Sequence, residues 1–207
     1  MANALRAHLA ELGIVARQGA AGFAALMARV ADETGSDLPP LARTALMRLV
    51  GQLRALQEEV DEVERHLLAW HRSSEVSRRL ETIPGIGPIT ASALAATVTD
   101  PSVFTSGRQL AAWIGLVPRQ SSSGGKERLG RITKQGEPYL RRLLVLGASA
   151  VMRFSDERPS ALGAWVTALR GRRPAMVAKV GLANKLARIA FAVLSRGETF
   201  RAGPRSA

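Results

Sequence analysis

The segment Pro84-Gly85-Ile86-Gly87-Pro88 separates two helical patterns in the sequence. The first pattern ends at Ile83, and apolar residues at helical spacing resume from Ile89 to Val98. Proline suits the first position of a helix, because the amide hydrogen that it lacks would have no partner there. We therefore expect a helical hairpin over residues 76–98, with its second helix beginning at Pro88.

The glycine turn of this hairpin predicts a contact with phosphate. Glycine permits backbone conformations that other residues avoid, so Gly85 and Gly87 can expose amide groups at the N-terminus of the second helix. The helix dipole adds positive potential there, which favours an anion. This arrangement resembles the helix-hairpin-helix motif, which holds DNA phosphates without reading the bases. On this interpretation Gly85→Val weakens DNA binding without unfolding the chain, whereas the alternative is a plain connector with Ile86 as an apolar plug.

The composition favours an all-α fold. Of the 207 residues, 46% are hydrophobic and only 4% are aromatic. Alanine, leucine and arginine dominate, and all three favour helix. We expect a helical coiled-coil arm over residues 1–75, followed by a basic helical domain that contains the helix-hairpin-helix over residues 76–200. A disordered tail is expected over residues 201–207.

The positive charge is confined to the second part of the chain. Residues 1–80 hold ten basic and ten acidic side chains, whereas residues 81–207 hold nineteen basic and seven acidic ones, so this part carries the net charge of +12. A neutral arm joined to a strongly basic domain indicates that the domain binds a polyanion, and DNA is the partner we expect. The alternative is a soluble basic protein whose charge merely resists aggregation.

The sequence argues against several classes of site and location. It contains no cysteine, so neither a disulfide nor a cysteine-based metal site can form. The longest nearly apolar run, Leu143 to Met152, is much shorter than the roughly 20 residues that span a bilayer. We therefore expect a cytoplasmic protein that makes no membrane contact. The seven acidic residues after residue 80 are not grouped, so we expect no metal ion or other cofactor in this chain.

A long helix is expected from about Leu41, after two short helices at residues 2–12 and 19–31. Its apolar positions alternate in spacing between three and four, and they are Leu46, Leu49, Leu53, Leu56, Val60, Val63, Leu67 and Trp70. This unbroken heptad predicts a coiled coil, formed with another segment or, as we expect, with further copies of the chain in a homo-oligomer. The alternative is an ordinary amphipathic helix packed on its own domain. His66 and His71 lie five positions apart, so they do not share a helix face for a metal, and we expect both to be solvated.

Further helices are predicted in the basic domain. Ser106 and Gln109 have the spacing of a capping box ahead of a short helix over residues 110–114. Trp113 lies on the apolar face of that helix, so we expect it to anchor the core. The remaining helices are expected at residues 139–152, 160–169 and 174–195.

A second glycine segment, Ser121-Ser122-Ser123-Gly124-Gly125-Lys126, supplies the candidate for catalysis, and Ser123 is its strongest nucleophile. Serine needs a base, a metal or a cation-rich pocket for activation. Lys126, Arg128 and Arg131 would neutralise a phosphodiester and stabilise its pentacoordinate transition state. No general base is evident nearby, so the alternative is a flexible loop that only binds phosphate.

The helix expected after this segment brings further cations to the same region. Arg141 and Arg142 lie near its first turn, where the positive end of the helix dipole repels them. A bound phosphate would relieve this repulsion, so both are predicted to contact DNA, as is Lys134. Tyr139, the only tyrosine, is a second candidate nucleophile, but we interpret it as an amphipathic surface residue because no histidine-rich pocket accompanies it.

Five short segments occur in an order that is specific to one family. They are Leu80-Glu81-Thr82-Ile83-Pro84-Gly85-Ile86-Gly87, Ala111-Ala112-Trp113-Ile114-Gly115-Leu116-Val117-Pro118-Arg119-Gln120, Ser122-Ser123-Gly124-Gly125-Lys126, Gly130-Arg131-Ile132-Thr133-Lys134-Gln135-Gly136 and Leu140-Arg141-Arg142-Leu143-Leu144. Together they closely resemble the C-terminal domain of insertion-sequence transposases of the IS-one-ten type. The arm from about Leu5 to Leu80 resembles the central helical region of the same family.

The resemblance implies a DNA recombinase that moves an insertion sequence under the guidance of an element-encoded RNA. In that family the serine directly before the glycine attacks DNA and holds it as a phosphoserine link, which implies this role for Ser123. Lys126 and Arg131 would clamp the phosphate, and the coiled coil would assemble several subunits. The full set of expected DNA contacts is Gly85, Gly87, Lys126, Arg128, Arg131, Lys134, Arg141 and Arg142.

The family also carries, ahead of the helical arm, a RuvC-like domain whose acidic residues bind Mg²⁺. The resemblance implies that this domain is missing from the present chain and that Mg²⁺ would enter only with it. The chain is therefore expected to be a truncated remnant, one part of a split gene or a chain with a misplaced start. In each case it would keep the nucleophile and the DNA surface but lack the metal half of the site. Two rival interpretations are a non-catalytic helix-hairpin-helix DNA-binding module and a structural oligomeriser whose basic face holds RNA.

Overall fold

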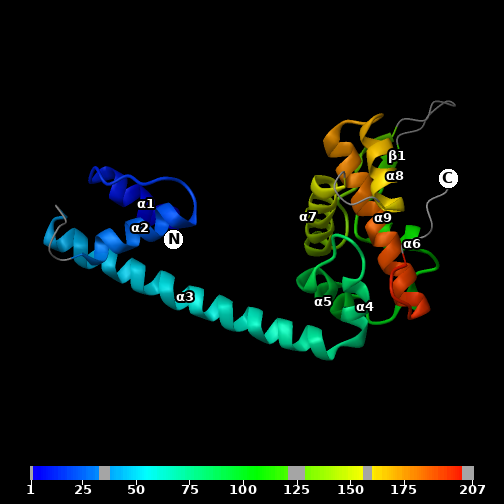
Figure 1. The fold of residues 1–207 in the computed structure, drawn as a ribbon, viewed down its shortest axis with the longest axis horizontal. Helices are drawn as coiled ribbons and strands as arrows, with labels where there is room; N and C mark the ends of the chain where they lie inside the picture. The colour runs from blue at the N-terminus through cyan, green and yellow to red at the C-terminus, as the bar shows by residue number, and fades with distance from the viewer. Residues whose placement is uncertain (1, 33–37, 121–128, 156–159, 202–207) are drawn as a thin grey trace. The chain divides into compact units, whose positions relative to one another are not determined.

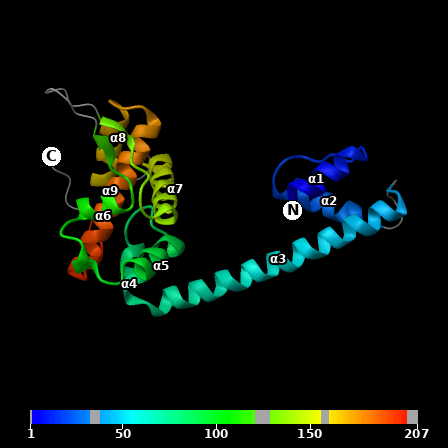
Figure 2. The same cartoon turned by 180° about the vertical axis from the view of Figure 1, so that it is seen from behind.

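The structure is a computed structural model that describes residues 2–32, 38–120, 129–155 and 160–201 (Figures 1 and 2). Within these ranges the chain is mostly helical, and its strands form a single two-stranded sheet. The mostly helical fold class expected from the composition is confirmed. The chain divides into two compact units, Met1–His66 and Leu67–Ala207, each of which has a hydrophobic core of its own.

The first unit is a small helical cluster. It comprises α1 (Ala2–Glu11), α2 (Ala20–Ala31) and the first part of α3 (Pro40–Ser73), so the helices expected in this region are confirmed. Its buried apolar side chains are Leu5, Leu9, Leu26, Val30, Leu38, Leu46 and Val50. The guanidinium of Arg6 ties the connection between α1 and α2, because it donates to the backbone oxygens of Arg17 and Gly19 at 3.1 and 3.0 Å.

The heptad positions of α3 fall into two groups. Leu46 is buried, and Leu53 packs, partly buried, against the core of the first unit. Further along the same helix, Leu56, Val60 and Val63 are exposed by 48, 51 and 65%. The early positions therefore belong to an ordinary amphipathic helix packed on its own unit, whereas the coiled coil expected from the later positions stays a prediction.

The second unit contains the end of α3 and a set of shorter helices. Their bounds are Glu75–Glu81 for α4, Pro88–Thr97 for α5, Gly107–Trp113 for α6, Pro138–Phe154 for α7, Ala161–Arg170 for α8 and Ala175–Arg196 for α9, with a 3-10 turn at Pro101–Val103. α9 packs against α4, α6, α7 and α8 (Figure 1). Its buried face includes Ala183, Ala187 and Ala190, whose small side chains allow close approach. The helices expected in this region are confirmed, with ends shifted by a few residues.

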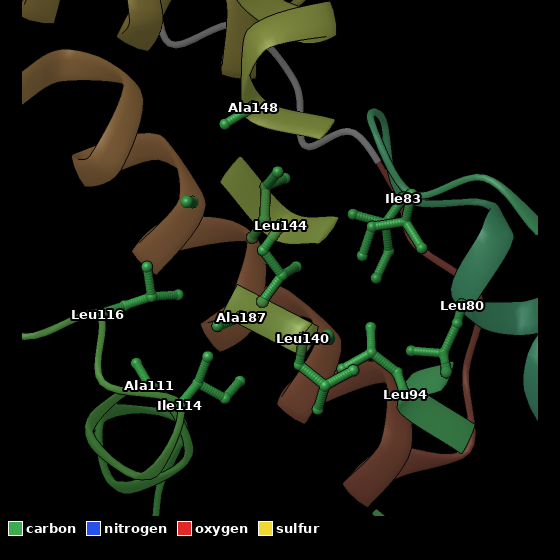
Figure 3. Close-up of a cluster of buried hydrophobic side chains, with 14 of the residues drawn as sticks. Leu80, Ile83, Leu94, Ala111, Ile114, Leu116, Leu140, Leu144, Ala148 and Ala187 are labelled. Carbon is green, nitrogen blue, oxygen red and sulfur yellow. The ribbon is translucent and has the colours of Figure 1, made fainter. Parts of the chain in front are cut away.

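The core of the second unit joins residues that are distant in sequence. Leu80 and Ile83 enter it from α4 and the turn behind it, Leu94 enters from α5, and Leu140 and Leu144 enter from α7 (Figure 3). All five are at most 1% exposed. Because burying one such side chain contributes about 1.5–3 kcal/mol, this cluster fixes the pair α4 and α5 against α7.

The two ends of the loop that was expected after α6 are short β-strands, which pair to form a β-hairpin. β1 (Pro118–Gln120) pairs antiparallel with β2 (Leu129–Ile132), and Gln120 lies opposite Leu129. The sequence did not indicate these strands, because segments of three and four residues are too short to show a period of two. Residues 121–128 join the two strands and lie outside the described residues.

Trp113 is not the core anchor that its position on an apolar helix face indicated. It is 39% exposed, and its ring meets that of Phe104 edge to face with 5.6 Å between the centroids. The interior positions of this region are taken by Leu110 and Ile114, both fully buried. The expectation failed because Trp113 lies at the margin of the stripe that those two residues define.

His71 is buried, which contradicts the expectation that both histidines of α3 are solvated. Its Nδ1 lies 2.7 Å from Ser77 Oγ and its Nε2 lies 2.9 Å from Glu81 Oε2, whereas His66 is exposed as expected. The chain leaves helical geometry at Ser74, which caps α4, and the face of α4 that carries Ser77 and Glu81 meets His71. Serine, histidine and carboxylate also form hydrolase triads, but Ser77 is fully buried, so this network is structural.

Candidate nucleic-acid interface

The base of the β-hairpin is fixed to the end of α6 by backbone hydrogen bonds. The amide of Thr133 donates to the carbonyl of Val117 at 2.9 Å, and the amide of Lys134 donates to the carbonyl of Gly115 at 3.2 Å. Lys134 has a φ of 55°, a left-handed conformation that non-glycine residues adopt only when their surroundings impose it. The main chain therefore leaves β2 along a path that the fold determines.

Two glycines make this junction possible. Gly115 and Gly136 have φ values of 80° and 85°. A Cβ atom on Gly115 would collide with the carbonyl of Gln135, and one on Gly136 would collide with the carbonyl of Trp113. The segment after β2 and the end of α6 therefore touch along their backbones, which only residues without a side chain allow.

Arg141 closes the same junction from the first turn of α7. Its Nη1 donates to the carbonyl of Ile114 at 2.8 Å and lies 3.4 Å from the carbonyl of Gln135. These oxygens offset the repulsion between the guanidinium and the positive end of the helix dipole, which the sequence had suggested a phosphate would do. A DNA contact by Arg141 stays a prediction, and its described contacts are with the protein.

Three cations lie around the hairpin base. Arg119 on β1, Arg131 on β2 and Lys134 just after β2 all have exposed side chains. One of the Arg119 nitrogens, Nη2, donates to the carbonyl of Thr133 at 3.3 Å, so this guanidinium lies beside the backbone that leads to Lys134. The sequence prediction did not include Arg119, although it flanks the serine–glycine segment on one side as Arg131 does on the other.

Arg142 is presented to solvent on the first turns of α7. Its guanidinium carbon lies 5.4 Å from the centre of the Tyr139 ring, an arrangement in which the ring attracts the cation. Tyr139 is 43% exposed, as expected for an amphipathic surface residue. The side chain of Glu137 caps this helix by accepting a hydrogen bond from the Tyr139 amide at 2.9 Å. The carboxylate of Glu137, which lies near Arg142 in sequence, is therefore engaged in capping the helix.

The predicted nucleophile lies outside the described residues, as do Lys126 and Arg128. What the structure describes are the two ends of the segment that contains them. Gln120 and Leu129 are partners in the sheet, so Ser123 belongs to a connection whose ends are held together by paired strands.

The two glycines of the α4–α5 turn differ in their surroundings. Gly85 has a φ of 85°, and a Cβ atom there would lie 2.6 Å from Val151 Cγ2 and 2.7 Å from the carbonyl oxygen of Gly147. Gly87 is exposed at the N-cap of α5 with φ −90°, and a Cβ atom there would meet nothing within 4 Å. Gly85→Val would therefore disturb packing against α7, contrary to our expectation that it leaves the chain folded, and Gly87 is the glycine that offers an open backbone.

Comparison with known proteins identifies the region that contains these features. The model of the Transposase IS116/IS110/IS902 family matches residues 77–162. This segment is therefore similar to that transposase family. The resemblance inferred from the sequence motifs is thus confirmed for the transposase segment, which runs from α4 to the start of α8.

Curated relatives match nearly the whole chain. A probable family 20 transposase of Pseudomonas aeruginosa is 44% identical over 204 residues, which are 98% of this chain and 60% of the relative. The transposase for insertion sequence element IS1328 of Yersinia enterocolitica is 41% identical and the one for IS1111A of Coxiella burnetii is 38% identical. These matches cover 96 and 97% of this chain and 58 and 55% of the relatives. The chain therefore spans between half and two thirds of the length of these transposases.

The described residues contain neither a metal-binding cluster nor a membrane-spanning helix. Within the transposase segment and elsewhere in those residues, no group of three or more histidine, cysteine, aspartate or glutamate side chains is arranged to hold a metal ion. None of the helices that the structure describes combines the length and the apolar character that crossing a membrane requires.

Proposed function

We propose that this chain is the DNA-binding and strand-transfer part of an insertion-sequence transposase, in which Ser123 is the nucleophile. The observation that carries the proposal is the β-hairpin inside the transposase segment. Its paired strands bracket the connection that contains Ser123, and exposed Arg119 and Arg131 lie on the two strands. The relatives are named as transposases of insertion elements, which supports DNA as the substrate.

In the proposed reaction Ser123 Oγ attacks the phosphorus of a DNA phosphodiester. A serine–phosphorus bond forms while the bond from phosphorus to one deoxyribose oxygen breaks. The serine proton passes to solvent, and the departing deoxyribose oxygen takes a proton. One phosphate ester replaces another, so a second DNA hydroxyl can attack the phosphoserine link, release the serine and rejoin the strands.

The cations near the hairpin supply electrostatic stabilisation to this reaction. A pentacoordinate phosphorane carries more negative charge than the starting diester, so donors fixed nearby lower the barrier. We assign this role to Lys126 and Arg131. Arg119, Arg128, Lys134 and Arg142 would hold the flanking backbone, because phosphate contacts position DNA without reading its sequence.

A second contact with DNA is proposed at the N-terminus of α5. The first hydrogen bond within this helix runs from the Ala91 amide to the Gly87 carbonyl, so the amides ahead of Ala91 have no partner within the helix. Gly87 is exposed and leaves room for a phosphate to approach them. A guide RNA and assembly of several copies through the exposed stripe of α3 complete the proposal.

A covalent trapping experiment tests the nucleophile. The 207-residue chain is incubated with labelled DNA carrying the ends of its insertion sequence, with and without the element RNA, and then denatured. A second arm adds the part of the Pseudomonas transposase that this chain does not cover. We expect a protein–DNA adduct that survives denaturation, disappears in Ser123→Ala and persists in the matched control Ser121→Ala.

The outcomes separate this proposal from its rivals. An adduct that Ser123→Ala retains would reject Ser123 as the nucleophile. Salt-sensitive DNA binding without an adduct in either arm would indicate a non-catalytic DNA-binding module. Binding of RNA but not of DNA would indicate the structural oligomeriser.

A further inference from the structure

A basic groove lies in the second unit, away from the residues assigned to the reaction. It has a volume of about 800 Å³ and is bordered by the start of α6, by α9 and by the segment that follows α9. Five cations line it, against the single carboxylate of Glu198, and they are Arg108, Lys185, Arg188, Arg196 and Arg201. None of the described ion pairs involves these five residues. The groove therefore carries a concentrated positive charge.

The cations of α9 share one face of the helix. Lys185, Arg188 and Arg196 stand three and then eight positions apart, which returns them to the same side at 3.6 residues per turn. Ile189 and Ala192 lie between them and give this wall an apolar lining. This basic stripe could have been found in the sequence, because Lys185, Arg188 and Arg196 lie on the helix face opposite the buried alanines. The sequence prediction assigned DNA contacts only to the cations near the serine–glycine segment and to the α4–α5 turn.

The opposite wall is held in place by hydrogen bonds. Gly197 ends α9 in a left-handed conformation, with φ 67°, and sends the chain back along the helix. Arg79 Nη1 donates to the Gly197 carbonyl at 2.8 Å, and the Phe200 amide donates to Thr82 Oγ1 at 2.8 Å. We call residues 197–201 the strap. Because α4 and its C-cap residue Thr82 hold the strap at two points, the groove is formed before any ligand arrives.

The floor of the groove depends on a close contact between α6 and α9. A Cβ atom on Gly107 would lie 3.1 Å from both the Cα and the carbonyl oxygen of Arg188. This approach brings Arg108 of α6 to the same opening as Arg188. The other end of α6 meets the hairpin base at Gly115, so α6 has the groove at one end and the hairpin at the other.

Lys185 is in an environment that favours an added negative charge. Its Nζ lies 4.3 Å from the centre of the Trp165 ring. Partial burial, and then repulsion from Arg188, lower the pKa of Lys185 below its ordinary value. A phosphate beside the ammonium group would oppose both effects.

We infer that this groove binds a single-stranded nucleic-acid segment, with its phosphates on the arginines and a base against Phe200 and the apolar wall. The inference rests on the proposed function, because it adds a second nucleic-acid surface to the same domain. Cations beside an aromatic and aliphatic lining suit unpaired bases, whereas a duplex offers phosphates but shields the faces of its bases. The α9 cations and the strap lie outside residues 77–162, so the family segment contributes only the α6 side of the groove.

Binding of labelled oligonucleotides tests the groove. Fluorescence anisotropy is measured over a range of salt concentrations with single-stranded DNA, single-stranded RNA of the same sequence, and the DNA duplex. The test variant is Arg188→Ala with Arg196→Ala, in which alanine keeps the helix and the Cβ atoms. The matched control is Arg172→Ala with Arg173→Ala, which removes the same charge from the exposed turn between α8 and α9. Circular dichroism verifies that each variant is folded.

We expect the groove variant to bind single strands at least tenfold more weakly than the control variant does. Its plot of log affinity against log salt should flatten by about 1.4, which is the change for two lost contacts to a single strand. The DNA and RNA arms then identify which strand the groove prefers. An equal loss in both variants would overturn the inference, as would a loss for the duplex as large as that for single strands.

The adduct experiment fails independently of this one. A wild-type chain that forms no serine adduct but loses single-strand binding in the groove variant would reject the nucleophile and keep the groove. A wild-type chain that forms the serine adduct, together with a groove variant that binds single strands normally, would keep the nucleophile and reject the groove. A wild-type chain that binds no nucleic acid at low salt would overturn both.

Discussion

The backbones of Gly85 and Gly147 are in direct contact, so neither position has room for a side chain. A Cβ atom on Gly147 would collide with the Gly85 carbonyl, and one on Gly85 would reach both the Gly147 oxygen and Val151. The contact joins the α4–α5 turn to the middle of α7. Gly85 is thus required for packing within the protein, whatever the turn also contacts.

We predict that Gly85→Ala lowers the free energy of unfolding by about 2–4 kcal/mol, from left-handed strain and overpacking together. Chemical denaturation followed by circular dichroism measures this loss. Gly87→Ala is the control, since its φ is ordinary and its surroundings are open. Equal stabilities of the two variants would contradict the packing role.

Gly87→Asp separates phosphate docking from stability at the α5 N-terminus. Aspartate is a favoured N-cap residue, so the variant should be at least as stable as the wild type. Its carboxylate would occupy the free amides and repel phosphate, so DNA binding should weaken severalfold, as measured by anisotropy. Gly87→Ala, which adds bulk without charge, should bind nearly as well as the wild type. Unchanged binding by Gly87→Asp would remove this contact from the proposal.

Arg141 and Arg142 are adjacent in sequence, but we predict opposite effects. Arg141→Ala leaves the carbonyl of Ile114 without its donor, which costs about 1–3 kcal/mol of unfolding free energy. Arg142→Ala should change stability by less than about 0.5 kcal/mol, because its side chain is exposed. It should nevertheless weaken DNA binding. Denaturation measures the stability of both variants, and anisotropy measures their DNA binding. If the two variants were equally destabilised, the hydrogen bonds of Arg141 would contribute no more to stability than an exposed arginine does.

The network around His71 predicts a local stability effect. His71→Ala removes one of the two partners of the buried Ser77 hydroxyl, the other being Ser92 Oγ at 3.3 Å, and we expect a loss of about 1 kcal/mol in unfolding free energy. His66→Ala lies on the exposed side of the same helix and should stay within about 0.5 kcal/mol of the wild type. Thermal denaturation of the two variants side by side checks this. If His71→Ala had the same unfolding temperature as the wild type, the hydrogen bonds of His71 would contribute nothing to stability.

The exposed stripe of α3 predicts self-association. Light scattering at high micromolar concentration should show a multimer, and Val60→Lys should reduce it to a monomer because a charge would face the partner helix. Glu58→Lys changes the charge at an outward-facing f position of the heptad and should leave the multimer intact. A monomeric wild type would remove the coiled coil.

Periodic features of the fold were predictable from the sequence, whereas single contacts were not. The helices of both units follow from spacing, from Pro88 and Pro138 at helix starts and from Gly197 at a helix end. The burial of His71 could not be foreseen, because its partners Ser77 and Glu81 reach it only after the chain changes direction at Ser74. Such changes of direction depend on tertiary packing, which a local pattern does not encode.

The candidate site was predictable to a similar extent. Exposed Arg131 and Arg142 follow from the concentration of charge, but the guanidinium of Arg141 is held by carbonyl groups that no spacing rule connects to it. Arg119 could have been included, since it mirrors Arg131 across the serine–glycine segment. The groove could not be predicted from the sequence, because it depends on the contact between Gly107 and Arg188, which are far apart in the chain.

The strap has a consequence for how the protein is made. Its hydrogen bonds to Arg79 of α4 and to the C-cap residue Thr82 both join residues 118 positions apart in sequence. During synthesis Arg79 and Thr82 leave the ribosome long before Gly197 and Phe200 exist, so α4 must wait for more than a hundred further residues before it acquires these partners. The second unit can therefore complete its fold only after the strap has been made, and a nascent chain stalled before residue 197 would expose the α4 surface that the strap covers.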